Sequence, residues 1–350
     1  MATLAEDAGL RDRKGGAVRS FADGGHGGVE MSTVLVTGAN GFVGGALAAQ
    51  LATTGHRLRL ASRSRALAPM QEAETFIHGD LGEPVDWTPA LAGTDVVVQC
   101  AARVHVIAEA AKDPFAEFRR CNVDGTLQLA RAAVACGVRR FVFVSSVKVN
   151  GEATPTGCPF TYADAPAPVD PYGVSKLEAE RGLFALAAET GLEVVVVRPV
   201  LVYGPGVKAN FLGMMRWLNV GVPLPLGAID NRRSLVAIDN LVDLLATCIV
   251  HPRAAGEVLL VSDGEDLSTT ELLRRMAAAL GRPSRLLPVP PGILELGARL
   301  LGKGSISRRL CGSLQVDITR TRNVLDWSPP VSVDDGLART ARHFLEHRRK

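Results

Sequence analysis

The feature that most constrains the fold is a regular alternation of short β-branched runs with alanine- and leucine-rich stretches, beginning at Thr33. Strands that are apolar on both faces and separated by helices form a parallel sheet covered on each side. The sequence therefore predicts an α/β fold with a doubly wound parallel sheet. The expected strands are residues 33–37, 57–60, 95–98, 140–144 and 193–197, and the helices between them include residues 44–54, 122–137 and 172–191.

The regular alternation of strands and helices ends at Arg198-Pro199, and the connections that follow are rich in proline and glycine. Helices are expected near residues 211–220, 239–249 and 268–280, with a strand at 258–262 that returns to the sheet. We therefore expect a small C-terminal substrate lobe interleaved with the main domain. The predicted domains are a main domain at residues 32–200 and a lobe formed mainly by 201–345, of which 230–262 return to the main domain.

Residues 1–31 are expected to be a disordered tail, and Met31 is an alternative start. This stretch lacks the continuous apolar run of a secretory signal. No run reaches the roughly 18 apolar residues of a membrane span, so we expect a cytoplasmic protein with no membrane span. The apolar segment 288–301 is broken by proline and glycine, which favours a helix packed on the surface.

Charge and cysteine usage exclude other classes of protein. The formal net charge is +3, from 39 basic and 36 acidic residues, which predicts no nucleic-acid partner. The six cysteines are widely separated and have no metal-ligand spacing. Reduced thiols and no metal site are therefore expected.

A glycine-rich turn joins the first strand to the first helix, with Gly38, Gly41 and Gly44 in a G-x-x-G-x-x-G pattern. Glycines there let the chain approach a pyrophosphate, which binds at the free amides of the helix N-terminus. Because strand, turn and helix occur in register, the pattern predicts a dinucleotide site. The residues expected to bind the dinucleotide here are Gly38, Asn40, Gly41, Phe42, Val43 and Gly44.

The end of the second strand bears on the choice between NAD and NADP. An acidic residue there usually binds the adenosine ribose, but the chain has Ser62-Arg63. A guanidinium suits the 2′-phosphate of NADP, and the alternative is a solvated loop arginine. Further along, Asp80 in Gly79-Asp80-Leu81 is positioned to accept from the adenine amino group, or is a turn aspartate.

Tyr172 and Lys176 lie four residues apart at the start of a long helix, hence on one face. A tyrosine acts as a base near neutral pH when a neighbouring cation stabilises its phenolate, and Lys176 supplies that cation. The alternative is an ordinary surface pair. Ser145 and Ser146 end the fourth strand, where a hydroxyl can donate to a substrate oxygen during hydride transfer, and the residues alone leave open which serves.

Taken together, these motifs closely resemble the extended short-chain dehydrogenases, the NAD-dependent epimerase/dehydratase family, across about residues 32–345. The motifs that carry the resemblance are the glycine turn, Gly79-Asp80-Leu81, Asn122 in Asn-Val-Asp-Gly-Thr, Ser145-Ser146, Tyr172-Gly-Val-Ser-Lys176 and Arg198-Pro199. The resemblance implies an NAD or NADP cofactor, Ser146 as the catalytic hydroxyl and Asn122 as a support of the site. It also implies a homodimer through residues 122–137 and 172–191. The further cofactor contacts that it implies are Leu81, Ala101, Ala102, Asn122, Tyr172 and Lys176.

The resemblance also implies how a nucleotide-sugar substrate is held. Asn210 and the following backbone at Phe211 correspond to the family's segment that binds the substrate pyrophosphate, and Arg233 to its phosphate-binding arginine. The chain departs from the family at Gln99, where a histidine is usual, and at Lys148-Val-Asn-Gly151. Whether Asn210 and Arg233 face one cleft distinguishes a nucleotide-sugar enzyme from a dehydrogenase of small ketones or steroids.

Several reactions fit this set of residues. A sugar dehydratase carries an Asp-Glu pair after its catalytic hydroxyl, whereas this chain has Val147-Lys148, so dehydration is disfavoured. A UDP-hexose 4-epimerase acting through a transient 4-keto sugar is preferred. An NAD(P)H-dependent reductase of a UDP-4-keto-6-deoxy-hexose stays open, and both belong to the branch that makes sugars for surface polysaccharide. A non-catalytic protein that senses dinucleotides is the third alternative.

Overall fold

The computed structural model describes residues 31–64, 73–104, 113–300, 304 and 310–347. The chain divides into two compact units, Met1–Glu30 and Met31–Lys350, and all the described residues belong to the second. The disordered tail predicted over residues 1–31 therefore lies, apart from Met31, outside the described residues.

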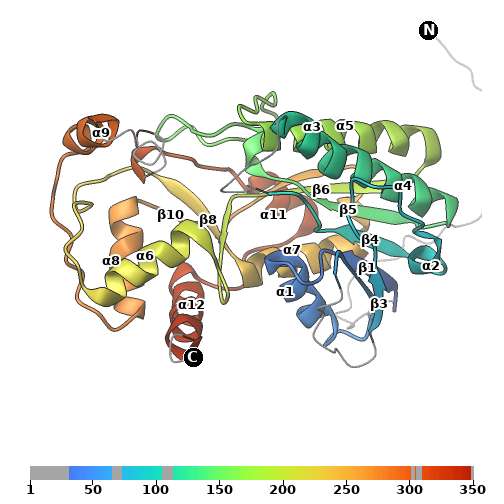
Figure 1. Cartoon of the computed structure of the whole chain (residues 1–350), viewed down its shortest axis with the longest axis horizontal. Helices are drawn as coiled ribbons and strands as arrows, with labels where there is room; N and C mark the ends of the chain where they lie inside the picture. The colour runs from blue at the N-terminus through green and yellow to red at the C-terminus, as the bar shows by residue number, and fades with distance from the viewer. Residues whose placement is uncertain (1–30, 65–72, 105–112, 301–303, 305–309, 348–350) are drawn as a thin grey trace, which may run out of the picture. The chain divides into compact units, whose positions relative to one another are not determined.

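The second unit is built on a seven-stranded parallel sheet with the order β3-β2-β1-β4-β5-β6-β9 (Figure 1). Its strands are β1 (Thr33–Thr37), β2 (Arg57–Ser62), β3 (Glu74–Ile77), β4 (Val96–Gln99), β5 (Arg140–Val144), β6 (Glu193–Pro199) and β9 (Val258–Val261). The order runs outward in both directions from β1, which is the topology of a doubly wound sheet. The predicted fold class is confirmed.

Helices cover both faces of this sheet, which gives it two cores. In β1, Val34 and Val36 enter one core and Leu35 the other, because successive side chains of a strand alternate between faces. The first face is covered by α1 (Phe42–Leu51) and α7 (Ile238–Val250), and the second by α2 (Thr88–Leu91), α4 (Gly125–Ala135) and α5 (Pro171–Thr190). Burial on both sides explains why these strands are apolar throughout.

The helix predicted over residues 122–137 is not one continuous α-helix. α3 (Pro114–Arg119) runs into a π-helical turn, η1 (Arg120–Asp124), and α4 follows directly. A π turn widens the helix by one residue and is frequent at functional sites. The apolar periodicity does not reveal the turn, because η1 keeps Cys121 and Asn122 buried as an α-helix would.

A small lobe contains a second sheet with the order β10-β8-β7. The strands are β7 (Leu201–Tyr203), β8 (Arg233–Ala237) and β10 (Asp266–Leu267). A third core joins this sheet to α6 (Ala209–Val220), α8 (Thr269–Ala279) and α12 (Val333–His347). Between these elements the chain returns to the main sheet, because α7 packs on α1 and β9 pairs with β6. β8 belongs to the small sheet instead.

The remaining described elements are short. They are η2 (Val147–Val149) and η3 (Pro252–Ala254), both 3₁₀ turns, together with α9 (Pro291–Leu300) and α11 (Thr319–Leu325). α9 falls within the apolar segment for which a surface helix is predicted. Within the described ranges, no helix is long and apolar enough to cross a membrane.

Candidate active site

The glycine turn after β1 is packed closely against neighbouring backbone. Gly38 has φ +65°, and a Cβ there would lie 2.8 Å from the backbone nitrogen of Ala101. A Cβ on Gly44 would lie 2.3 Å from the carbonyl oxygen of Gly38. A larger residue at either position would force the turn apart, so the sequence needs glycine at both.

The N-terminus of α1 is shaped to receive an anion. Gly41 is the N-cap residue, and no side-chain hydrogen bond caps the helix within the described part of the chain. Phe42 and Val43 turn their side chains onto the core, so they face a ligand through their backbone amides. Asn40 is exposed beside them. A pyrophosphate fits this arrangement, because the first amides of a helix point outward and carry partial positive charge.

Arg63 and Asp80, the residues predicted for the adenosine end, follow β2 and β3. Arg63 is exposed. Burial lowers the pKa of the neighbouring His78, and the positive charge of Arg63 lowers it further. Asp80 Oδ1 accepts a 2.8 Å hydrogen bond from the Gly82 amide and lies 3.5 Å from the Arg120 guanidinium. The hydrogen bond from the Gly82 amide, and then the charge of Arg120, hold the pKa of Asp80 below its usual range. Partial burial of the carboxylate acts in the opposite direction.

The residues after β4 lie opposite the glycine turn. Ala101 donates its amide to Thr37 Oγ1 at 3.2 Å, and Thr37 donates to Gln99 Oε1 at 2.6 Å. Gln99, where the family usually has histidine, therefore ties β1 to β4 at the edge where Ala101 and Ala102 emerge. Leu81 is buried in the core below α4.

Tyr172 and Lys176 lie one turn apart at the start of α5. Asp170 caps this helix by accepting a 2.7 Å hydrogen bond from the Gly173 amide. Lys176 Nζ donates a 2.8 Å hydrogen bond to the carbonyl oxygen of Val144, the last residue of β5, and lies 5.9 Å from the centroid of the Tyr172 ring. The ammonium group is thus fixed between the strand end and the tyrosine.

The two candidate serines point in different directions. Ser145 is buried and donates to Glu180 Oε1 at 2.5 Å. Ser146 forms a side-chain hydrogen bond with Tyr172, and its Oγ accepts from the Lys148 amide at 3.2 Å. The structure therefore brings Ser146, and not Ser145, to the tyrosine.

Burial sets the acid–base properties of this group. Burial, and then the charge of Asp170, raise the pKa of Tyr172 well above its ordinary value, and the hydrogen bond from Ser146 opposes them. Burial lowers the pKa of Lys176 to about 8, against the opposing effects of Glu180 and Cys100. At neutral pH the phenol is protonated in this arrangement, and it needs additional positive charge to become a base.

A buried ion pair behind the serines was not recognised from the sequence. The Arg198 guanidinium binds both carboxylate oxygens of Glu180 at 3.0 and 2.5 Å, and its Nη1 donates to Asn150 Oδ1 at 3.0 Å. Glu180 also holds Ser145, so the network joins α5 to the ends of β5 and β6. The Arg-Pro motif after the fifth predicted strand was the available signal, but a sequence gives no partner for it.

Asn122 holds two segments together from the π turn. Its Oδ1 accepts from the Arg103 amide at 2.8 Å, and its Nδ2 donates to the Arg103 carbonyl and to Ser175 Oγ, both at 3.0 Å. Ser175 lies beside Lys176 on α5. Asn122 thereby connects α5 to the segment that leaves β4.

The three residues predicted to bind substrate differ in their surroundings. Asn210 is exposed at the start of α6, where no side-chain cap is present among the described residues. Phe211 is buried and stacks on Tyr203 with ring centroids 5.4 Å apart, so it faces a ligand through its backbone. Arg233 is half-buried in β8 and donates to the Gly312 carbonyl at 3.1 Å. Burial lowers the pKa of Arg233.

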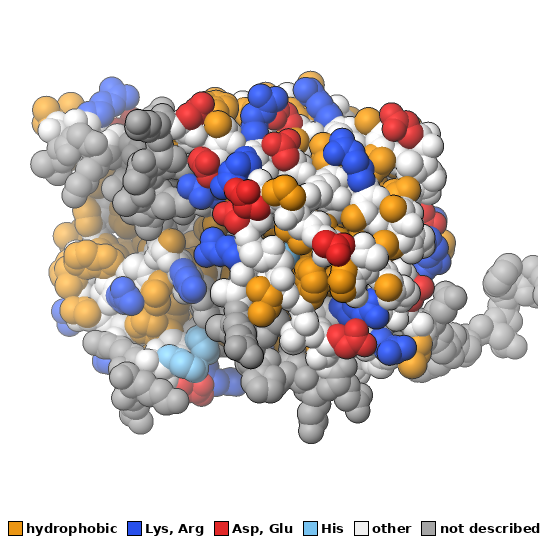
Figure 2. Space-filling view, turned by 45° about the vertical axis from the view of Figure 1, so that its right-hand side comes forward, with side chains coloured by type: hydrophobic (Ala, Val, Ile, Leu, Met, Phe, Trp, Pro, Cys, Tyr) orange, Lys and Arg blue, Asp and Glu red, His pale blue; other side chains and the backbone are white. Residues whose placement is uncertain are grey.

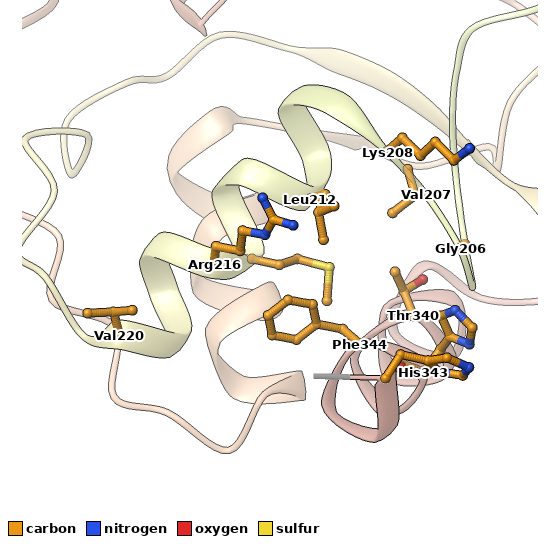
Figure 3. Close-up of a pocket in the computed structure, with 12 residues that line it drawn as sticks. Gly206, Val207, Lys208, Leu212, Arg216, Val220, Thr340, His343 and Phe344 are labelled. Atoms are coloured by element: carbon orange, nitrogen blue, oxygen red, sulfur yellow. Dashed lines mark hydrogen bonds between the residues drawn. The ribbon is translucent and has the colours of Figure 1, made fainter. Parts of the chain in front are cut away.

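A cavity of about 550 Å³ lies between α6 and α12 (Figure 3). Lys208, Arg216 and His343 are among its lining residues, whereas Asn210 and Arg233 are not. This cavity is therefore not the common cleft expected for those two residues.

Comparisons with known proteins show which family the chain resembles. A profile of the NAD dependent epimerase/dehydratase family matches residues 34–262. The chain is 47% identical over 315 residues to a UDP-glucose 4-epimerase of Vibrio cholerae, covering 90% of this chain and 96% of that protein. It is 31% identical to a UDP-glucose 4-epimerase of Mycolicibacterium smegmatis, and the match covers 89% of this chain and 97% of that protein.

A solved structure, MoeE5 in complex with UDP-glucose and NAD, superposes with a TM-score of 0.72 at 27% identity. The superposition covers 91% of this chain and all of MoeE5. The match thus includes the small lobe as well as the main sheet. The family profile and the Vibrio relative show the family, and the fold brings together Ser146, Tyr172 and Lys176 as that family's motifs require. The chain therefore belongs to the NAD dependent epimerase/dehydratase family.

Proposed function

We propose that this chain is an NAD(P)-dependent nucleotide-sugar oxidoreductase that inverts C4 of a UDP-hexose through a transient 4-keto sugar. The observation that carries the proposal is the contact of Ser146 and Lys176 with Tyr172 at the sheet edge that also bears the glycine turn. Identity of 47% with a UDP-glucose 4-epimerase supports the choice of substrate and reaction.

Residues 32–200 supply the cofactor site and the catalytic group, and residues 201–345 supply most of the substrate site. The amides of Gly41 to Gly44 hold the cofactor pyrophosphate, while Arg63 and Asp80 face the adenosine. When bound there, the cofactor would supply reversible hydride transfer with the sugar, and its oxidised form would carry positive charge.

Tyr172 takes the proton of the C4 hydroxyl as the hydride leaves C4, and returns it when the hydride comes back to the opposite face. Lys176 stabilises the phenolate form of Tyr172 by its charge. Ser146 donates to the sugar oxygen and keeps it in reach of Tyr172. Rotation of the keto sugar between the two transfers is what inverts the configuration.

The N-terminus of α6 and Arg233 bind the two phosphates of the substrate. No side-chain hydrogen bond caps the described α6 N-terminus, so the amides near Asn210 and Phe211 are available to an anion. Arg233 adds a planar guanidinium, which suits two phosphate oxygens.

Product analysis tests the function directly. Purified protein incubated with UDP-glucose or UDP-N-acetylglucosamine, without added cofactor, is expected to yield the C4 epimer, because the hydride is returned to its donor. Turnover that requires a UDP-4-keto sugar and NADPH would establish the reductase instead. Binding of NAD(P) without turnover of either substrate would establish a dinucleotide sensor.

The proposal extends to the setting of the enzyme. A cytoplasmic location is proposed, since nucleotide sugars for surface polysaccharide are made there, and a homodimer is proposed through α4 and α5. When the α4 and α5 helices of two copies pack together, they form a helix bundle that buries apolar surface.

A further inference from the structure

One end of the small lobe lies away from the seven-stranded sheet (Figure 1). It exposes an unusual number of large apolar side chains. We call this surface the apolar end. It consists of Trp217, Val220, Val222, Leu287, Ile293, Leu296 and Leu300. Large exposed apolar surfaces mark sites of interaction in proteins.

Helix α9 contributes the most exposed part. Ile293, Leu296 and Leu300 are 62%, 61% and 80% exposed. Their spacing of three and four residues puts them on one side of the helix. The helix therefore turns an aliphatic face outward, the reverse of a helix whose apolar face packs on a core.

Backbone contacts connect the segments that carry the apolar end. Leu224 pairs with Leu286 in an isolated parallel bridge, and the Gly227 amide donates to the Leu287 carbonyl at 2.8 Å. These contacts place the end of α6 beside the segment that leads into α9. Figure 1 shows both along the same edge, and Figure 2 shows apolar side chains gathered on that side.

Arginines surround the apolar end and lack acidic partners. Arg282 donates to Asn219 Oδ1 at 3.3 Å and Arg285 to the Gly221 carbonyl at 3.4 Å, both neutral oxygens. Among the described residues, no carboxylate forms an ion pair with Arg216, Arg282, Arg285 or Arg299. Four guanidinium groups thus remain available to an external anion.

The cavity between α6 and α12 adds to this positive charge. Arg216 and Val220 line it and flank the exposed Trp217 in the sequence of α6, while Lys208 and His343 line its other end (Figure 3). No carboxylate lines the described cavity. The basic character of the surface therefore continues from the apolar end into the groove.

We propose that the apolar end docks the enzyme on the surface of a membrane containing anionic phospholipids. Aliphatic side chains and a tryptophan enter the interfacial region while arginines pair with lipid phosphates. Because α9 is only ten residues long, it lies on the membrane and does not cross it. The glycine turn lies in the other part of the unit, so docking leaves the cofactor site open.

Charge favours a membrane over a second copy of the chain. In a two-fold symmetric interface the same surface faces itself. Such an interface would gather the arginines of both copies, Arg282 and Arg285 among them, on one buried surface, which is unfavourable without acidic partners. A negatively charged lipid surface supplies those partners.

Vesicle flotation tests the proposal. Full-length protein is expected to float with phosphatidylcholine vesicles containing about 30 mol% phosphatidylglycerol, and to bind vesicles of phosphatidylcholine alone at least about tenfold more weakly. Binding should fall as salt is raised. The triple variant Ile293→Ser, Leu296→Ser, Leu300→Ser should lose at least about tenfold in binding to the anionic vesicles, because it removes the aliphatic face.

Matched variants make the result specific. Val250→Ser removes from α7 an apolar side chain that is 45% exposed, and this variant should bind vesicles as the unchanged protein does. Arg282→Gln with Arg285→Gln should weaken binding to anionic vesicles only. Epimerisation of UDP-glucose without vesicles serves as the folding control for every variant.

Two outcomes would overturn the proposal. One is equal flotation of the triple variant and Val250→Ser, and the other is dissociation of a dimer by the triple variant in sedimentation velocity. If the triple variant has lost its solution activity, the arginine pair variant decides instead, and unchanged binding by that variant would also refute docking.

Discussion

At the scale of single residues, the environment of Lys176 supports the proposed role of Tyr172 as a base. The Lys176 ammonium is buried, donates to a strand carbonyl and lies 4.4 Å from the Phe143 ring centroid, so its position is fixed. Its pKa of about 8 means that the charge is present below about pH 8 and is lost above it. The same burial raises the pKa of Tyr172, so the tyrosine depends on neighbouring cations.

Replacing each residue of the pair separates their roles. Tyr172→Phe should lower kcat by about a thousandfold, because it removes the proton acceptor. Lys176→Met should move the acidic limb of the kcat profile to higher pH by about one unit or more, since the phenolate loses its stabilising cation and the pKa of Tyr172 rises further. The measurement is kcat against pH with UDP-glucose. An acidic limb that stays in place in Lys176→Met would show that Lys176 does not act through Tyr172.

Arg63 decides between the two cofactors in a similar way. If its guanidinium binds a 2′-phosphate, Arg63→Ser should weaken NADP binding by about tenfold or more and leave NAD binding unchanged. Isothermal titration of both dinucleotides against both proteins gives the answer. Equal affinities before and after the substitution would make Arg63 an ordinary solvated side chain.

At the scale of elements, α5 carries both the proposed catalytic pair, Tyr172 and Lys176, and the residues that fix its position. One turn beyond Lys176, Glu180 binds Arg198 from β6 and Ser145 from the end of β5. Glu180 and Arg198 have side chains only 3% and 6% exposed. The network therefore fixes α5 relative to the strand ends, and with it the distance from Lys176 to Val144.

Breaking this network should be costly. Glu180→Ala leaves the Arg198 charge buried without its partner, and is expected to lower the free energy of unfolding by about 3 kcal/mol or more. Glu178→Ala on the same helix removes a partner of Arg119, whose side chain is 61% exposed, and should cost at most about 1 kcal/mol. Urea unfolding of the three proteins compares them, and equal midpoints would contradict a structural role for Glu180.

At the scale of the whole molecule, the fold separates three kinds of surface. The sheet edge carries the proposed cofactor-binding and catalytic groups, and the small lobe carries the proposed substrate and membrane contacts. α4 and α5 lie side by side on the outer face of the main sheet (Figure 1). Exposed positions on this pair include Arg131, Arg181 and Ala185. A second copy meeting there would leave the other two surfaces free.

The dimer can be tested at one of these positions. Sedimentation velocity of the unchanged protein should give a dimer, and Ala185→Arg should give a monomer, because it places a long charged side chain in a closely packed helix interface. Val250→Arg, on α7, serves as a control that should stay dimeric. A monomer for the unchanged protein at micromolar concentration would remove the dimer proposal.

Much of this protein was determined by the sequence alone, because the features concerned are local. Alternating apolar strands and helices fixed the doubly wound sheet, and glycines at 38 and 44 fixed a turn that no side chain fits. The spacing of Tyr172 and Lys176 placed both on one face of α5. Each of these follows from backbone geometry within a few residues of the chain.

Only the tertiary structure decided which groups meet. Adjacent serines point to opposite sides of a chain leaving a strand, so Ser146 reached Tyr172 while Ser145 reached Glu180. The pairing of Arg198 with Glu180 and the outward apolar face of α9 likewise depend on how distant segments pack. Periodicity gives the face of each element, but the partner of that face depends on contacts between segments far apart in the sequence.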